Sequence, residues 1–433
     1  MRFVRNLGVV FFLLFVFGVV EHELIYANAY ITEIDEKDIR DKFIEQMESG
    51  NALRQVALVA FGAFGIVALG FCRDKPWNLR WSVLTPLLIL AGLCLVSVAW
   101  SAQPLLTAKR LVVLACMVLG SAGLARMLTP RDFLSIVLVS LTLFIAGSLA
   151  FELAAGGRPW SGGDYRFGGT LHPNAQANYC GILCLAAVCH PFGFGRRWIR
   201  YTLVAVGLGL IVLTQSRTGL MSVAVALVST WMMRLPPGLK WAGFSLFMVA
   251  VAGLFISYNS VGTGARHTVL DTALLGRTQQ AGSLTGRVPL WEELLEYSRK
   301  KPLLGYGYEG FWTQDRIAAI MKSQKWSLQN AHNSYFEIVL QLGFVGLFFA
   351  VWFLLASAAA LSAANRLTRD PGYAFAFGVL TLGVFNSLLE SLFIKLRFCP
   401  TVALIGVLMV ALFFPSEPGD ETDASPTPQP LAG

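Results

Sequence analysis

The chain has 433 residues, of which 55% are hydrophobic and only 14% are charged, whereas an ordinary soluble domain is about 45–50% apolar and about 25% charged. This composition excludes a soluble globular fold. The formal net charge of +8 does not indicate nucleic acid as a partner, because the 34 Lys and Arg residues are scattered between apolar runs and form no basic face.

Twelve apolar runs predict membrane-spanning helices, each of which needs about 20 residues. The runs are 7–20, 52–71, 82–100, 111–125, 133–154, 176–192, 199–214, 219–233, 241–258, 335–358, 372–389 and 398–414. The fold class is therefore an all-α polytopic membrane protein. With the amino terminus inside, the inside segments carry 14 Lys and Arg residues and the short outside turns carry five, so charge bias places both termini inside.

The amino-terminal segment 1–29 allows two interpretations. Arg2 and Arg5 before an apolar core fit either an uncleaved helix or a signal peptide that is removed. Glu21 follows the apolar core directly and favours the uncleaved helix. The pattern identifies no role for the acidic segment 21–50.

The spacing of the runs divides the chain into four parts. Residues 1–258 hold spans one to nine, residues 259–334 form a large outside loop, residues 335–414 hold spans ten to twelve, and residues 415–433 form a disordered inside tail rich in Pro, Asp and Glu. The outside loop 155–175 is the other segment long enough to hold a site. Functional residues are expected in these two loops.

Arg217 is the most unusual single residue in the sequence. It lies in Thr214-Gln-Ser-Arg-Thr-Gly219, a polar interruption between two apolar runs. An ionisable side chain near the membrane is costly unless it is paired. A binding residue and an arginine that reaches lipid phosphates are both consistent with this position.

His332 precedes the tenth apolar run in Asn330-Ala-His-Asn-Ser334. Ser334 and Glu337 fit a capping box, which predicts that a helix begins there. The free N–H groups at the start of this helix would favour an anion next to the His332 imidazole. The alternative is that His332 is only a helix cap or a residue of the membrane interface.

Arg287 opens a predicted loop helix that runs to Lys301. Together Arg217, Arg287 and His332 form a plausible clamp for a phosphate-bearing lipid, because arginine binds phosphate oxygens bidentately and stays charged. His172 and Asn174 lead into the sixth run and either line the same cavity or only cap a helix.

No cofactor or metal is expected. The seven cysteines show no C-x-x-C or Cys/His ligand spacing, and no D-x-D motif or acidic cluster indicates a divalent metal. The segment Gly305-Tyr-Gly-Tyr-Glu-Gly310 matches a nucleotide-binding pattern without the βαβ context and is interpreted as a turn. Its aromatic residues, among them Tyr308, offer flat faces to sugar rings or anchor the loop.

These motifs resemble the O-antigen ligase and polymerase superfamily. The resemblance is carried by Ser216-Arg-Thr-Gly219, Leu284-Thr-Gly-Arg287, Pro302-Leu-Leu-Gly-Tyr-Gly-Tyr308, Ala331-His-Asn-Ser334 and Leu342-Gly-Phe-Val-Gly346. Their order and spacing match over roughly 160–350, with the ligase-related region at about 200–350. The loop signature is most similar to exopolysaccharide polymerases of the succinoglycan type.

The resemblance implies a metal-independent inverting glycosyltransferase of the GT-C kind in the bacterial inner membrane, with its active face periplasmic. The substrate would be a glycan on undecaprenyl diphosphate, with polysaccharide-export or chain-length proteins as further partners. By this resemblance Arg217 and Arg287 bind the diphosphate and His332 positions or deprotonates the acceptor. Tyr308, Asn333 and Glu337 would hold sugar or orient His332.

Three functions are compatible with these residues. The first is a polymerase that joins lipid-linked repeat units into exopolysaccharide or O-antigen. The second is an O-antigen ligase that transfers a finished glycan to lipid A-core or a protein; no acceptor motif separates the two. The third is a transporter or flippase of lipid-linked oligosaccharide. A transporter predicts charged residues at the bilayer midplane, whereas in this sequence they gather at one face, in loops.

Overall fold

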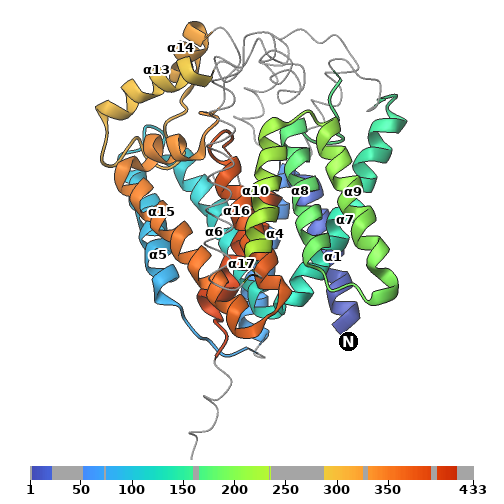
Figure 1. Ribbon diagram of the computed structural model, residues 1–433. Helices are drawn as coiled ribbons and strands as arrows, with labels where there is room; N and C mark the ends of the chain where they lie inside the picture. Colours follow the sequence, from blue (N-terminus) through green and yellow to red (C-terminus); the bar gives the residue numbers. More distant parts are fainter. Residues whose placement is uncertain are drawn as a thin grey trace, which may run out of the picture.

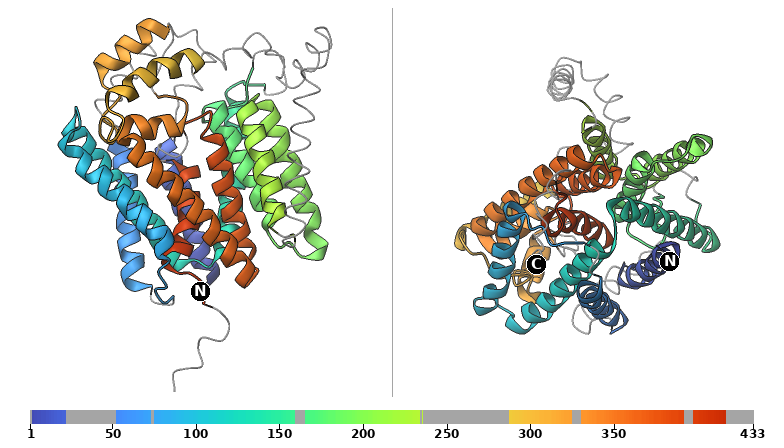
Figure 2. Two further views of the ribbon diagram at one scale, coloured as in Figure 1. Left: turned by 60° about the vertical axis from the view of Figure 1, so that its left-hand side comes forward. Right: turned by 90° about the horizontal axis from the view of Figure 1, so that it is seen from below.

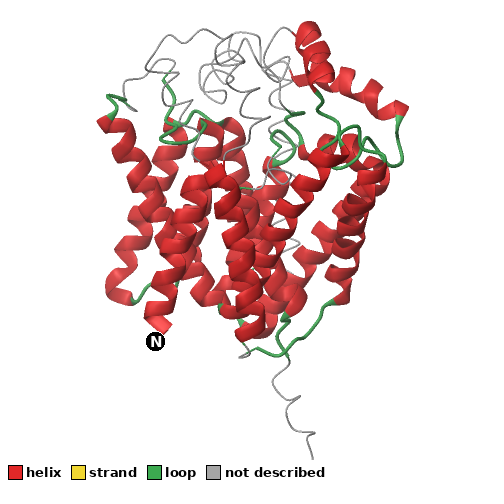
Figure 3. Ribbon diagram, turned by 180° about the vertical axis from the view of Figure 1, so that it is seen from behind, coloured by secondary structure: helices red, strands yellow, loops and turns green. Residues whose placement is uncertain are grey.

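The computed structural model of the chain describes residues 2–21, 52–72, 75–158, 165–233, 235, 287–324, 330–391 and 397–416. In this part of the chain the regular structure is helical, apart from an isolated parallel bridge between Asn78 and Phe413 (Figure 1, Figure 3). The predicted all-α class is confirmed for these residues.

Most helices run roughly side by side in a bundle (Figure 1). They are α1 (Arg2–Glu21), α4 (Ala52–Phe71), α5 (Trp81–Val96) with the 3-10 turn η1 (Ser97–Ala99), α6 (Pro104–Met127), α7 (Pro130–Ala154), α8 (Pro173–Cys189), the 3-10 turn η2 (Phe194–Arg196), α9 (Arg197–Leu213), α10 (Arg217–Met232), α15 (Ser334–Thr368), α16 (Pro371–Asn386) and α17 (Phe398–Leu412). Two further helices, α13 (Arg287–Lys300) and α14 (Gln314–Gln324), lie across the end of the bundle opposite to the chain's amino terminus. We call this end the α13 end.

Each predicted apolar run overlaps one of the bundle helices, except 241–258, which lies outside the described residues. Six described helices are long and apolar enough to cross a membrane: α1, α4, α5 with η1, α6, α7 and α15. The helices α8, α9 and α10 have only 17, 17 and 16 residues, and the polar turn Thr214-Gln-Ser216 separates α9 from α10. The total of twelve spans stays a prediction.

The outer surface of the bundle is apolar. Large side chains such as Phe15, Ile66 and Leu355 are 54%, 59% and 67% exposed. Exposed apolar area on this scale is not stable in water and indicates contact with lipid. In contrast, α8, α16 and α17 are buried on nearly all sides, as expected of helices at the centre of a bundle.

The helices α4 and α6 approach each other through glycines. A Cβ atom at Gly65 would overlap the carbonyl of Leu119, and one at Gly123 would lie 2.6 Å from the Cα of Gly65. Small residues let helix backbones come this close in membranes, where packing replaces the hydrophobic effect as the source of association. The close α4–α6 contact therefore depends on having no side chain at these positions.

The helix α15 is broken at Gly343, whose φ of 67° and ψ of −169° are not helical. The loop after α13 fills the break. Phe344 N donates to Pro302 O at 2.8 Å, and Tyr306 N and Gly307 N donate to Leu340 O and Gln341 O at 2.8 and 2.9 Å. Irregular backbone at membrane depth requires such partners. The first turns of α15, which follow His332, are thus fixed by the loop.

Candidate active site

Segments far apart in the sequence meet at the α13 end of the bundle (Figure 2). The helices α8, α10 and α15 begin there, α9 and α16 end there, and α13 starts beside them. A polar cluster forms between these ends.

Glu390, in the turn after α16, is the centre of this cluster. Its Oε1 accepts hydrogen bonds from the Arg287 guanidinium and from Asn174 Nδ2, both at 2.8 Å. Its Oε2 lies 3.6 Å from His332 Nδ1. The side chains of Arg287, Glu390 and His332 are 13%, 17% and 26% exposed, so the cluster is screened from bulk water and still open on one side.

The electrostatics of Glu390 reflect these neighbours. Burial by itself raises the pKa of the Glu390 carboxyl, but the His332 imidazole, the Arg287 guanidinium and the His172 imidazole outweigh burial and hold that pKa at about 2. The carboxylate is therefore ionised at all physiological pH values, and it supplies one fixed negative charge among several positive or protonatable groups.

His172 and Asn174 belong to the turn that starts α8. His172 is the N-cap, and its Nδ1 accepts from Asn174 N at 3.2 Å. Asn174 Oδ1 accepts from the Arg166 guanidinium at 2.7 Å, while Arg166 Nε donates to Thr214 O at 2.9 Å. Both predicted residues thus join the cluster: Asn174 links Glu390 to a third arginine, and His172 caps α8 beside them.

The predicted capping box of Ser334 and Glu337 is wrong. The N-cap of α15 is Asn333, whose Oδ1 accepts from Tyr335 N and Phe336 N at 2.9 and 3.0 Å. Ser334 N donates instead to Ser387 O at 2.9 Å. These bonds occupy the first N–H groups of α15, so the helix start does not offer the free donors expected for an anion.

Glu337 is buried between α15 and the loop that precedes it. Its carboxylate accepts from Trp312 Nε1 at 2.9 Å and from Ala331 N at 2.6 Å. The contact with Ala331 fixes the backbone next to His332. We therefore place Glu337 as a support for the His332 segment, which has a left-handed φ of 49° at His332 itself.

Arg217 is the first residue of α10 and lies at the α13 end, half-buried. The turn before it is fixed by Ser216, whose Oγ accepts from Gly219 N at 3.2 Å. One turn deeper, α10 is joined to α16 and α8: Asn386 Nδ2 donates to Ser222 Oγ, and Asn178 Nδ2 donates to Asn386 Oδ1, both at 3.4 Å. This buried amide layer lies beneath the charged cluster.

Tyr308 packs in a different place. It is 7% exposed and contacts Cys94 and Leu342, and its backbone N–H donates to Ser97 Oγ at 2.9 Å. Its ring therefore does not offer an open face to a sugar; it anchors the loop to the end of α5 and to α15 beside its break at Gly343. Phe311 is also fully buried, which confirms the structural interpretation of the glycine-rich turn.

Two residues of the cluster carry signals too weak to be found in the sequence alone. Glu390 ends an apolar run as a single acidic residue, and Arg166 is one of several loop cations. What identifies Glu390 is its position: a lone carboxylate at the end of an apolar run meets arginine and histidine from other segments. That meeting depends on the tertiary fold.

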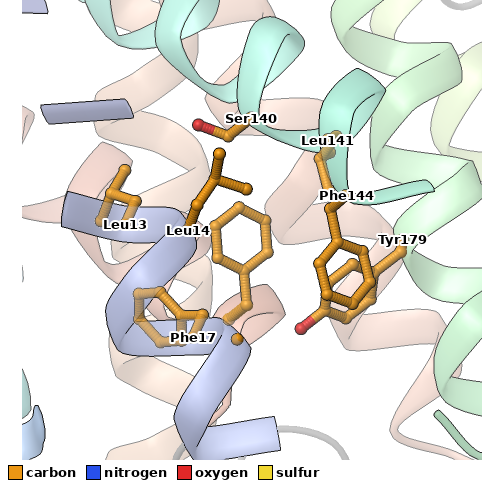
Figure 4. A pocket seen from close by; sticks show the side chains of 9 residues that line it. Leu13, Leu14, Phe17, Ser140, Leu141, Phe144 and Tyr179 are labelled. Atoms are coloured by element: carbon orange, nitrogen blue, oxygen red, sulfur yellow. The ribbon is translucent and has the colours of Figure 1, made fainter. Parts of the chain in front are cut away.

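The bundle also holds a small apolar cavity between α1, α7, α8 and α17, surrounded by the side chains of Leu14, Phe17, Phe144 and Tyr179 and lined by no residue of the charged cluster (Figure 4). It contains no charged group. In the part of the chain that the structure describes, no group of three or more His, Cys, Asp or Glu side chains comes together to hold a metal ion.

The helical bundle, its lipid-compatible surface and the charged cluster at one end define a multi-pass membrane protein with a polar site at one end of the bundle. Residues 202–351 match the family model described as O-Antigen ligase. This match confirms the resemblance to the O-antigen ligase-like superfamily that the motifs showed. The matched range contains Arg217, Arg287 and His332 and ends before Glu390.

A curated relative agrees with this assignment. The chain is 30% identical over 114 residues to the exopolysaccharide production protein ExoQ of Rhizobium meliloti (strain 1021). The similarity covers 24% of this chain and 26% of the relative, so the chain matches about a quarter of the relative's length.

Proposed function

We propose that this protein is a glycosyltransferase that joins undecaprenyl-diphosphate-linked oligosaccharide repeat units into exopolysaccharide or O-antigen. The reaction would take place at the periplasmic face of the bacterial inner membrane, with the segment 259–334 on that side and both termini in the cytoplasm. The observation that carries the proposal is that Arg287 and His332, both in the region similar to the O-antigen ligase family, meet at the Glu390 carboxylate at the end of a membrane bundle.

The chemistry follows from the groups present. The acceptor hydroxyl oxygen attacks the anomeric carbon of the donor sugar, and the bond from that carbon to the diphosphate oxygen breaks on the opposite face, which inverts the configuration. The hydroxyl proton goes to His332, and the bonding electron pair remains on the diphosphate. Arg287 and Arg217 stabilise that developing charge in a site with little water.

Arginine is suited to this role without a metal ion. Its guanidinium presents parallel N–H donors to phosphate oxygens and stays ionised. The Arg287 side chain is 13% exposed, and a charge in such a low-dielectric environment interacts more strongly than in water. We therefore propose a metal-independent reaction, in which fixed cations replace the usual divalent ion.

The second candidate is an O-antigen ligase, which the description of the matched family favours. Donor chemistry is the same in both functions. They differ in the acceptor: a polymerase uses a second lipid-linked glycan, whereas a ligase uses lipid A-core or a protein.

The decisive experiment supplies purified protein with lipid-linked repeat units as both donor and acceptor. Ladders of longer lipid-linked glycan from wild type, absent with Arg217→Ala and His332→Ala at normal protein abundance, support a polymerase. Donor consumed only after addition of lipid A-core or another acceptor identifies a ligase. No consumption under either condition contradicts both and favours a transporter.

A matched control is available on α13. Arg299 forms a surface pair with Glu296, both 64% exposed, so Arg299→Ala removes an arginine from the same helix as Arg287. We expect Arg299→Ala to retain activity and Arg287→Ala to lose it. Equal loss in both variants would point to a general effect of charge on α13.

A further inference from the structure

Glu390 has a geometry that the proposed reaction does not use. Its two carboxylate oxygens have different partners: Oε1 receives Arg287 and Asn174, while Oε2 faces His332 Nδ1. The 3.6 Å between Glu390 Oε2 and His332 Nδ1 is an ion-pair distance just longer than a hydrogen bond, so a small rotation of either side chain brings the two atoms into hydrogen-bond contact.

We propose that Glu390 is a positioning residue that fixes the orientation and tautomer of His332. This rests on the proposed function, in which His332 takes the proton of the acceptor hydroxyl. With Nδ1–H directed at Glu390, the lone pair of the imidazole lies on Nε2, at the opposite side of the ring. Nε2 is then the atom that accepts the proton.

The physical basis is the difference between the two ring nitrogens. In a neutral imidazole one nitrogen carries hydrogen and the other accepts, and the partner of one nitrogen sets the state of the other. An ionised carboxylate can only accept hydrogen bonds, so it selects the Nδ1–H tautomer. It also stabilises the imidazolium that forms when Nε2 is protonated, as the carboxylate does in a Ser-His-Asp triad.

The backbone around His332 is tied to the same turn as Glu390. Asn330 Oδ1 accepts from His332 N at 2.9 Å and from Ser391 Oγ at 3.1 Å. Ser334 Oγ donates to Glu390 O at 3.1 Å. The segment that carries His332 is therefore hydrogen-bonded to the segment that carries Glu390 both before and after His332. These bonds fix the distance between the imidazole and the carboxylate.

Arg287 does not compete for this role. Its guanidinium contacts Glu390 Oε1 at 2.8 Å, and this oxygen is shared with Asn174. A guanidinium that turns toward a donor phosphate leaves Oε2 beside His332. The Glu390 carboxylate thus lies between Arg287, which binds the donor, and His332, which faces the acceptor, and it orients His332.

The test compares Glu390→Gln with a matched control. The Glu309 carboxylate pairs with Arg110 and has a side chain 16% exposed, close to the 17% of Glu390. Glu309→Gln removes a comparable half-buried ion pair without touching His332. Glu390→Asp keeps the negative charge on a shorter side chain and serves as the conservative variant.

Two measurements separate positioning from a structural role. The first is nitrogen NMR of protein labelled with ¹⁵N-histidine, in which loss of one signal in His332→Gln assigns His332 among the 5 histidines. The second is kcat and the donor KM in the lipid-linked repeat-unit assay. We expect Nδ1–H in wild type and in Glu309→Gln, and loss of this preference in Glu390→Gln.

The kinetic expectation is a fall in kcat of about 100-fold or more for Glu390→Gln, since general-base catalysis contributes about 10²–10⁴-fold. The donor KM should stay the same or fall, because Arg287 keeps its charge and loses only its internal partner. Glu390→Asp should recover part of kcat.

The following outcomes overturn the proposal: Nε2–H at His332 in wild type, a tautomer unchanged in Glu390→Gln, or a raised donor KM with unchanged kcat. The wild-type spectrum alone is decisive if Glu390→Gln does not fold. A tautomer change in a protein that consumes no lipid-linked donor would support the positioning role and contradict the proposed function.

Discussion

Gly343 offers the most direct test of how the α15 break supports the site. Its φ of 67° and ψ of −169° lie in a region used almost only by glycine, and a Cβ atom there would overlap the carbonyl of Leu303. The backbone conformation costs about 1–3 kcal/mol for a non-glycine residue, and overpacking costs about 1–3 kcal/mol more. Gly343→Ala should therefore destabilise the protein by about 2–6 kcal/mol.

The control is Gly147→Ala in α7, where nothing lies within 4 Å of the added atom. A glycine inside a helix costs about 0.5–1 kcal/mol relative to alanine, so this variant should be neutral or slightly stabilised. Thermal unfolding in detergent compares the two.

Labelling of Cys94 with a thiol-reactive dye adds a local measurement. Cys94 is buried against Tyr308 and Leu342, next to the break. We expect Gly343→Ala to unfold at a lower temperature, to expose Cys94 earlier and to lose activity as the His332 segment shifts. Equal unfolding temperatures for Gly343→Ala and Gly147→Ala would refute the reasoning.

Four further predictions concern packing, pH, metal and topology. Gly65→Ala should weaken the α4–α6 contact and lower the unfolding temperature, whereas Gly70→Ala on the same helix, with nothing within 4 Å, should not. The pKa of Glu390 is lowered from 4.5 to about 2, so the ionised carboxylate adds about 3 kcal/mol to the free energy of unfolding above pH 4.5, and this contribution is lost as pH falls toward 2. The difference in unfolding temperature between wild type and Glu390→Gln should therefore shrink between pH 4.5 and pH 2. Chelator should leave turnover unchanged, and restoration of lost activity by a divalent ion would contradict the metal-independent reaction. Reporter fusions at Gly264 and Arg197 should report opposite sides of the membrane, and signals from one side would contradict the proposed topology.

The charged cluster shows how far motif reasoning reaches. His332 and Asn174 were identified in the sequence because they precede apolar runs, and Arg287 because it opens a predicted loop helix; the structure joins all three through Glu390. Tyr308 was selected as an aromatic residue of the glycine-rich turn that offers a flat face to a sugar ring, but its side chain is buried. Residue type and position at a membrane edge are therefore not sufficient to define the site.

The capping pattern of α15 illustrates a second limit. Ser334 and Glu337 have the spacing of a capping box, yet Asn333 caps the helix and Ser334 N bonds to Ser387 O. Local spacing predicts which bonds are possible within one segment. Competing partners from α16 and from the Trp312 loop decide which bonds form.

The sequence by itself determined the membrane environment and the helical class, because apolar runs of span length can satisfy their backbone hydrogen bonds only as helices in lipid. It also revealed the resemblance to the O-antigen ligase and polymerase superfamily, through short motifs that follow one another in the family's order. Only the tertiary structure decided that Glu390 is the centre of the site and that the loop after α13 fills the break at Gly343. Both features join segments separated by tens of residues, and such contacts depend on how helix ends meet in space.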